Sequence, residues 1–352
     1  MLEPAPEKIC LIRTSAVGDT VHALALANGL KQGFPNASLT WVLQTIPYEM
    51  VMHQPCVDRF ITFDRKTGPA GWRKLIADLR QQRFDLAVIP QVSAKVSLIA
   101  LFTPAKIKLG FDWHRSRELH WLATNHHIPG RRPMGHVQDQ FFEFLEYLGI
   151  GNFTKTWDFC FTPEERRWQK AYFDRIDHPV AGFVIATAHR QKEWAPACYA
   201  RVMDAVKSRL GLEPVMIGGP SAREKQIAEE ITAHCKCRPV IALEKPIRRT
   251  MMQLQGCRLV VSPDTGPLHI AVAMGVPTIG LYGYSNPRRC GPYRFHDLLI
   301  DHYNDPDAQH APITRKTKPG RMETITPEEV IEKIQYCLTA YPEPENLPEG
   351  AK

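Results

Sequence analysis

The stretch from Leu259 to Tyr282 constrains the fold of this chain more than any other. Its first residues close an apolar run that is typical of a buried strand. The letters DTGP at 264–267 then predict the start of a helix, because Asp is a favourable N-cap and Pro suits the first helical turn. That helix ends at Gly275, and a second apolar run follows at once. A strand, a helix and a strand joined by such short turns predict one βαβ step of a parallel sheet.

The turn at 264–267 is also a candidate site for an anion. Gly266 lets the backbone approach a ligand closely. The first N–H groups of a helix have no partner within it, and the positive end of the helix dipole favours negative charge. A phosphate group fits such a place. The letters DTG also occur at ordinary capped helices, so this turn alone leaves both interpretations open.

Strand-like runs alternate with amphipathic segments of helical length through most of the chain. In the first half the predicted strands are 9–13, 39–43, 59–62 and 85–90, and the predicted helices are 18–32, 46–54, 70–82, 93–102 and 137–148. In the second half the strands are 182–186, 214–217, 240–243, 259–261 and 277–282, and the helices are 195–210, 221–234, 250–255 and 269–274. This order predicts an α/β protein with two doubly wound parallel sheets, each covered by helices on both faces.

We expect two Rossmann-like domains, 1–175 and 176–325. After about residue 104 the alternation breaks into a segment rich in Arg, His and Trp. A helix over 326–340 begins with a Thr326 cap, and we expect it to pack back on the first domain. Ligands of such sheets lie at the carboxyl ends of the strands, where the topology switches. Two such sheets facing across a cleft would therefore hold ligands between them.

Length and composition are those of a globular protein whose 352 residues can bury two cores. No apolar run approaches the roughly 18 residues that a transmembrane helix needs, and the first residues do not resemble a secretory signal. The nine cysteines are scattered and odd in number, which favours reduced thiols. A net charge of +7 favours an anionic partner. We expect a cytoplasmic protein.

The sequence predicts no metal site. Cys235 and Cys237 are the one close cysteine pair, and no His or Cys cluster accompanies them. Asp305-Pro306-Asp307 has the spacing of a D-x-D metal motif, but it lies in a loop, with a proline between the acids and no strand before it. His126 and His127 are adjacent, and adjacent side chains point apart on most backbones.

A second turn that could bind or act on a ligand follows the first predicted strand, 9–13. Ser15, Gly18 and Asp19 lie between that strand and the next helix, and Gly18 allows a tight turn. Asp19 is either a charge that complements the helix dipole or a carboxylate that acts on a ligand. A carboxylate beside a helix N-terminus keeps a low pKa and stays ionised at neutral pH, as a general base requires.

The second half carries further polar residues at strand ends. Thr187 and Lys192 lie in a charged loop, for which a solvated surface is the simplest interpretation. Glu224 is either an exposed first-turn glutamate or a ligand contact, and His269 is either a core residue or a ligand contact. A lysine at a strand end suits a leaving diphosphate, because the negative charge on that group grows in the transition state.

Three motifs together resemble the bacterial family 9 glycosyltransferases, the lipopolysaccharide heptosyltransferases. They are DTGPLHIAVAMGVPTIGLYG followed by NPRRCGPY, the SxxGD turn at 15–19, and Lys192-Glu193-Trp194, which matches a K-x-W element. The resemblance covers most of the chain and implies a GT-B fold. It also implies that Asp19 is the catalytic base. The donor-binding residues that it implies are Thr187, Lys192, Glu224, Asp264, Thr265, Gly266 and His269.

The activity implied by the resemblance is an inverting, metal-independent transfer of heptose. The donor would be ADP-heptose, and the acceptor a hydroxyl of the lipopolysaccharide inner core, on Kdo-lipid A or on a core heptose. No cofactor would be required. Another nucleotide sugar or acceptor, a non-catalytic nucleotide-sugar-binding relative and an epimerase acting on the free nucleotide sugar all remain open. A dinucleotide-dependent oxidoreductase is not favoured, because ICLIRTSAVGD lacks the G-x-G-x-x-G fingerprint.

The acceptor is expected to lie against the first domain. Besides Ser15 and Gly18, the candidates are basic residues that lie between 104 and 133, near two tryptophans: Arg115, Arg117, Arg131 and Arg132. A solvated basic face would explain them too. Arg also recognises phosphate and carboxylate, and Trp favours membrane interfaces. We therefore expect an anionic lipopolysaccharide acceptor and contact with the cytoplasmic face of the inner membrane. No nucleic-acid partner is expected, because no nucleic-acid-binding motif accompanies the basic residues.

Overall fold

The computed structural model of this protein describes residues 3–130, 134–305 and 312–342. The chain forms two compact units, Met1–Cys160 and Phe161–Lys352. The division therefore lies earlier than the predicted boundary at 175. The reason is α7 (Pro163–Phe173), which packs on α10 (Ile247–Gln255) of the second unit, where Gln169 donates to the carbonyl of Met252 at 2.8 Å.

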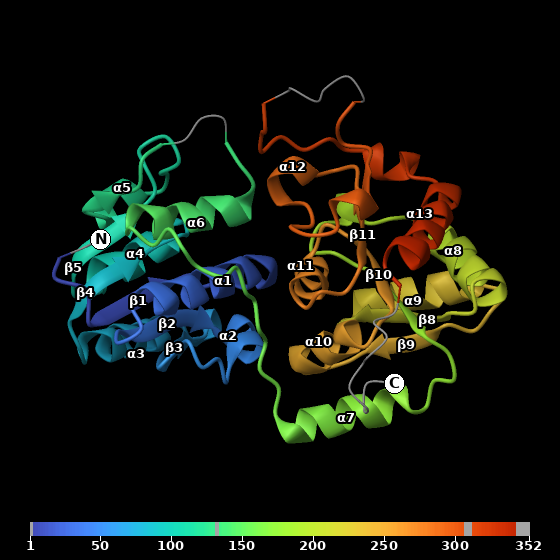
Figure 1. Cartoon of the computed structure of the whole chain (residues 1–352), viewed down its shortest axis with the longest axis horizontal. Coiled ribbons are helices and arrows are strands. Elements are labelled where there is room, and N and C mark those ends of the chain that lie inside the picture. The colour runs from blue at the N-terminus through green and yellow to red at the C-terminus, as the bar shows by residue number, and fades with distance from the viewer. Residues whose placement is uncertain (1–2, 131–133, 306–311, 343–352) are drawn as a thin grey trace. The chain divides into compact units, whose positions relative to one another are not determined.

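The first unit is built on a six-stranded parallel sheet of order β3-β2-β1-β4-β5-β6 (Figure 1). The strands are β1 (Lys8–Ile12), β2 (Ser38–Gln44), β3 (Arg59–Phe63), β4 (Phe84–Val88), β5 (Ala105–Gly110) and β6 (His126–His127). The helices are α1 (Val17–Gly33), α2 (Thr45–Val51), α3 (Gly68–Arg80), α4 (Ala94–Phe102), α5 (His120–Ala123) and α6 (Val137–Tyr147).

Helices cover both faces of this sheet. The crossovers through α1 and through α4 run in opposite directions along the sheet, so right-handed connections place these two helices on opposite faces. Apolar residues of α3, α4 and α5 share one core with the strands, while α1 packs on α6.

The second unit repeats the plan with a parallel sheet of order β12-β11-β10-β7-β8-β9. The strands are β7 (Val180–Val184), β8 (Glu213–Gly218), β9 (Val240–Leu243), β10 (Leu259–Pro263), β11 (Thr278–Tyr282) and β12 (Leu299–Asp301). Besides α7 and α10, the helices are α8 (Pro196–Arg209), α9 (Ala222–His234), α11 (Gly266–Ala273), α12 (Pro287–Cys290) and α13 (Pro327–Ala340).

The position of α13 differs from the prediction. Thr326 caps it as expected, with its side chain accepting the N–H of Glu329. The helix packs on α8, however, and Val330, Ile334 and Cys337 are buried in the core of the second unit. Its apolar face is therefore buried within the second unit.

The alternation predicted from the sequence is confirmed, but five short helices and strands were missed. These are β5, α5 and β6 in the segment rich in Arg, His and Trp, the four-residue α12 and the three-residue β12. In β5 lysines alternate with apolar residues, and only its last two residues are buried. The other four elements have two to four residues each, which is too few to show a period.

Each sheet has one topological switch point. In the first unit the chain passes from β1 outward to β2 and β3 and then returns to β4 on the other side of β1. In the second unit β7 and β10 are related in the same way. The carboxyl ends of β1 and β4, and those of β7 and β10, are where an open α/β sheet offers room for ligands.

Candidate active site

The turn after β1 is tied to the end of β4. Arg13 donates from Nη1 to the carbonyl of Pro90 at 2.8 Å, and the N–H of Thr14 donates to the side-chain oxygen of Gln91 at 2.8 Å. These bonds fix the backbone at the switch point of the first sheet. Ser15 lies in the turn between β1 and α1, whereas Gly18 is the second residue of α1 and does not form the tight turn expected from the sequence. Both residues are partly exposed.

Asp19 lies in the first turn of α1, where its carboxylate is held from one side. Oδ2 accepts the N–H of Ala16 at 3.3 Å and forms an ion pair with Arg13, while the Asp19 side chain remains 37% exposed. Among the described residues, Oδ1 makes no hydrogen bond. Burial favours the neutral acid, but the charge of Arg13, the nearby His22 and the Ala16 N–H together lower the pKa of Asp19 below its ordinary value. The result is a fixed, ionised carboxylate with one oxygen available to accept a proton.

Asp19 is supported by residues that were not predicted from the sequence. His22 follows one turn later in α1 and is buried, with Nδ1 2.8 Å from the side-chain oxygen of Gln138 in α6. Gln138 donates in return to the carbonyl of His22 and accepts the indole N–H of Trp157. No local pattern predicts these contacts, because His22 and Gln138 are 116 residues apart in sequence.

Arg115, one of the predicted acceptor contacts, has a different place. It is buried, pairs with Asp112 and with Glu143 (2.6 Å), and donates to the carbonyl of Pro129 at 2.9 Å. Two carboxylates therefore already neutralise its charge, and it stabilises the segment around β5. Arg117 is exposed and remains a candidate, whereas Arg131 and Arg132 lie outside the described residues.

In the second unit, Lys192 and Asp264 meet at the switch point. Lys192 lies in the short 3₁₀ turn Arg190–Lys192 after β7, and Asp264 follows β10. The Lys192 ammonium is 2.6 Å from Oδ2 of Asp264, although 72 residues separate the two. The hydroxyl of Ser285, which follows β11, donates to the same oxygen at 2.5 Å.

Asp264 is the more buried member of this group. Its side chain is 10% exposed, and Nε2 of His269 lies 3.8 Å from Oδ1. Burial would raise the pKa of Asp264, but His269 and Lys192 outweigh it and hold that pKa far below its usual range. A permanent negative charge thus fixes the direction of Lys192.

The expectation that Asp264 caps the following helix is corrected. The N-cap of α11 is Thr265, and its side chain makes no capping hydrogen bond. The carboxylate of Asp264 is engaged with Lys192 and Ser285 and is therefore not directed at the helix N–H groups. The first N–H groups of α11 are left for another acceptor, and an anion fits there.

Thr187 lies in the loop that carries Lys192. Its hydroxyl donates to the carbonyl of His189 at 2.6 Å, and its N–H donates to Glu193 at 3.3 Å. Glu193 forms an ion pair with Arg223, which also donates to the carbonyl of Thr187 at 3.2 Å. The contacts of Thr187 thus shape the loop, and Arg223 of α9 brings to it a cation that was not predicted from the sequence.

Glu224 acts within its own turn. One oxygen accepts the N–H of Gly219 at 2.6 Å, and the other accepts from Ser221 in a capping box at the start of α9. The interpretation of Glu224 as a first-turn helix residue is therefore supported by geometry. Any contact with a ligand would use a carboxylate that is already held in place.

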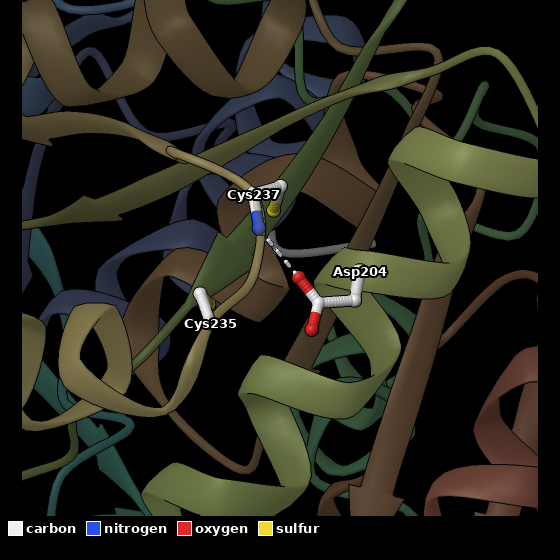
Figure 2. A group of neighbouring side chains, drawn as sticks. All are labelled: Asp204, Cys235 and Cys237. Atoms are coloured by element: carbon white, nitrogen blue, oxygen red, sulfur yellow. Dashed lines mark hydrogen bonds between the residues drawn. The ribbon is translucent and has the colours of Figure 1, made fainter.

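One group of side chains has the composition of a metal site. Asp204 of α8 lies with Cys235 and Cys237, and their ligand atoms are all within 4.8 Å of one another (Figure 2). The carboxylate of Asp204 accepts the N–H groups of Lys236 (2.9 Å) and Cys237 (2.8 Å), so it also closes the turn after α9. Burial raises the pKa values of both thiols, which keeps them protonated at neutral pH.

The D-x-D motif at 305–307 is described only in part. Asp305 pairs with Arg321, and Asp307 lies outside the described residues.

Comparison with known proteins decides the family. The model of glycosyltransferase family 9 (heptosyltransferase) matches residues 72–317. This chain belongs to glycosyltransferase family 9. The family 9 protein is 32% identical over 305 residues to lipopolysaccharide core heptosyltransferase OpsX of Haemophilus influenzae, covering 86% of each chain.

Solved structures share the fold of this family 9 protein. A family 9 glycosyltransferase from Veillonella parvula superposes with a TM-score of 0.82 at 21% identity, over 95% of this chain and 98% of that one. The structure of Escherichia coli ADP-heptose lps heptosyltransferase II gives a TM-score of 0.75 at 21% identity, over 95% and 99%. The prediction of a glycosyltransferase with a two-domain GT-B fold is confirmed.

Proposed function

We propose that this family 9 glycosyltransferase moves heptose from ADP-heptose to a hydroxyl of the lipopolysaccharide inner core, on Kdo-lipid A or on a core heptose. The observation that carries the proposal is the pairing of Lys192 with Asp264 beside the uncapped N-terminus of α11. This combination suits a diphosphate that leaves with growing negative charge. Two of the relatives named above, those from Haemophilus influenzae and Escherichia coli, are called heptosyltransferases and support heptose as the sugar and the lipopolysaccharide core as the acceptor.

In the proposed donor site two kinds of positive group meet the diphosphate. Lys192 would bridge from Asp264 to a phosphate oxygen, and the N–H groups of Thr265 and Gly266 would donate to the others. His269, which contacts Asp264, would lie near the same phosphates. These groups can balance the charge of the leaving ADP without a metal ion, so we propose a metal-independent reaction that uses no cofactor. Excess EDTA should then leave the rate of transfer unchanged, and a loss of activity that added metal restores would contradict a metal-independent reaction.

The proposed reaction exchanges one bond for another at the anomeric carbon. The acceptor hydroxyl attacks from the face opposite the diphosphate, a new C–O bond forms, the bond to ADP breaks, and the configuration inverts. The hydroxyl proton passes to Asp19, whose Oδ1 is available and whose pKa is lowered, so that the base is ionised before the reaction begins. ADP leaves with the electron pair of the broken bond.

The proposed place of action is the cytoplasmic face of the inner membrane, where the acceptor is anchored by lipid. In the described part of the chain no helix is long and apolar enough to cross a membrane. Contact with the membrane would therefore be peripheral. Ser15, Gly18 and Arg117 remain the proposed acceptor-side residues among those that the structure describes.

The experiment that tests the proposal measures ADP release from ADP-heptose with and without deacylated inner-core acceptor. We expect release only with acceptor, and NMR of the product should show an inverted anomeric linkage. Release without acceptor would instead indicate hydrolysis or an epimerase-like reaction on the free donor. Tight ADP binding without release in either case would point to another sugar or acceptor, or to a non-catalytic relative.

A further inference from the structure

The exposed apolar side chains of this protein are concentrated on one surface. Ten large hydrophobic side chains are exposed among the described residues, and six of them lie between 98 and 122. We call these six the apolar surface: Leu98, Leu101, Phe102, Trp113, Leu119 and Leu122. The last three are 61–73% exposed. Scattered exposed leucines are ordinary, whereas a gathered set of this kind marks an interaction surface.

Contacts between the elements show that this is one surface. Leu98, Leu101 and Phe102 lie on the outer side of α4, at helical spacing, while Val96, Ile99 and Ala100 face the core of the first unit. α5 packs on α4, as Figure 1 shows, and the hydroxyl of Ser97 donates to the carbonyl of Glu118 at 2.9 Å. The residues beside Glu118 therefore extend the outer side of α4.

The turn that presents Leu119 has an uncommon backbone. Glu118 and Leu119 have φ values of 51° and 65°, in the left-handed region that favours glycine. Next to this turn, Trp113 is 65% exposed, and its ring lies 5.3 Å from that of Trp121. Leucine and tryptophan side chains held outward in this manner are suited to an apolar medium with a polar boundary.

Basic side chains border the apolar surface. The guanidinium of Arg80 lies 5.8 Å from the ring of Phe102, and the ammonium of Lys108 donates to the carbonyl of Leu101 at 3.2 Å. Arg117 is exposed next to the turn. The one acidic residue of that turn, Glu118, accepts the N–H of Ala94 through its carboxylate. An apolar surface with a basic border matches the acyl and phosphate layers of an anionic bilayer.

We propose that the outer side of α4 and α5 docks on the surface of an anionic lipid bilayer. The apolar surface would enter the interface, and Arg80, Lys108 and Arg117 would contact lipid phosphates. The biological benefit rests on the proposed function, because an acceptor anchored in lipid is reached more readily by a transferase held at the same surface. The docking itself requires neither the donor nor the acceptor.

The test uses the full-length protein and vesicles of phosphatidylglycerol and phosphatidylethanolamine that contain no lipopolysaccharide. We expect the protein to co-sediment with these vesicles, to bind phosphatidylcholine vesicles more weakly, and to lose binding as salt rises. Leu98→Gln with Leu122→Gln should weaken binding by about tenfold or more, because two apolar side chains leave the interface. The control is Ile241→Gln, at a residue of β9 that is 53% exposed, and it should bind the anionic vesicles as strongly as the wild-type protein.

Transfer to a deacylated, soluble acceptor separates this proposal from the proposed function. The double variant should transfer to that acceptor at the unaltered rate. Vesicle binding without any transfer activity would contradict the proposed function and leave the docking surface standing. Failure of the wild-type protein to bind anionic vesicles would overturn the docking proposal. So would a double variant that converts a dimer into a monomer while vesicle binding is unchanged, since the apolar surface would then join two copies of the chain.

Discussion

Each switch point carries an ion pair between a basic side chain and an aspartate, but the more buried partner differs between the two. At the end of β1 the arginine is the deeper partner, with Arg13 10% exposed and Asp19 37% exposed. At the end of β10 the carboxylate is deeper, with Asp264 10% exposed and Lys192 20% exposed. In each pair the deeper charge fixes the outer one. The first unit therefore presents a carboxylate, and the second presents an ammonium group.

This difference shows how one fold provides two kinds of chemistry. Both sheets place the residues after their first and fourth strands at the same edge, so the scaffold supplies the location. The sign of the outer charge then determines whether that location suits a proton acceptor or a phosphate. Substitutions that remove one member of a pair test this comparison directly.

The largest expected effect follows the loss of the outer carboxylate. Asp19→Asn removes the proposed base while keeping shape and hydrogen-bonding groups, and transfer should fall by about 100- to 10,000-fold. Binding of ADP should be unchanged in a calorimetric titration. Asp58→Asn is the matched control, because Asp58 likewise pairs with a basic side chain, that of Lys31, and accepts a backbone N–H but lies away from the switch point. Near-normal transfer by Asp19→Asn would remove Asp19 from the role of base.

Loss of the outer cation, Lys192, should reduce transfer less than loss of Asp19, and it should weaken donor binding as well. Lys192→Ala should weaken ADP-sugar binding and slow transfer together, by about 10- to 100-fold, because the developing charge on the diphosphate loses a partner. Steady-state kinetics with varied donor and varied acceptor measure both. In Lys207→Ala, which breaks a lysine pair with Glu213 elsewhere in this unit, neither quantity should change. A loss confined to acceptor affinity would place Lys192 on the acceptor side.

Removing the deeper cation should alter pH dependence more than maximal rate. Arg13 lowers the pKa of Asp19, so Arg13→Gln should raise that pKa and move the acidic limb of the kcat/KM profile to higher pH. The rate should fall at acidic pH and recover as the carboxylate ionises. An unmoved limb, in a variant whose thermal unfolding shows an intact fold, would contradict the pairing as the cause of the low pKa.

The smallest effect on donor affinity is expected from Ser285, which donates a hydrogen bond to Asp264 of the second ion pair. Ser285→Ala removes one hydrogen bond to Asp264 while the pair with Lys192 remains. Donor affinity should fall by about two- to tenfold, as for a single hydrogen bond, and acceptor affinity should not change. Competition by ADP measures the first quantity. Ser208→Ala, which removes a hydroxyl that bonds within α8, is the control.

The candidate site was predictable in part. The position of Asp19 after β1 and of the DTGP turn after β10 follows from strand ends and helix starts, which are local features of the sequence. The partners were not predictable in this way. Arg115 was expected to face an acceptor because it lies in a basic segment, but a carboxylate 28 residues away in α6 neutralises it. Asp264 was expected to cap α11 for a local reason, and a lysine from another loop engages it instead.

The sequence by itself determined the order of strands and helices, the turns at the strand ends and membership of family 9. Periodicity, capping and motif spacing depend only on residues that are close together in the sequence. Only the tertiary structure decided which charge is deep and which is outer, which arginine is neutralised, and where the exposed leucines gather. Those properties depend on burial and on pairs such as Lys192 and Asp264, 72 residues apart. Electrostatic contacts act through space, so they form only once the sheets bring distant strand ends together.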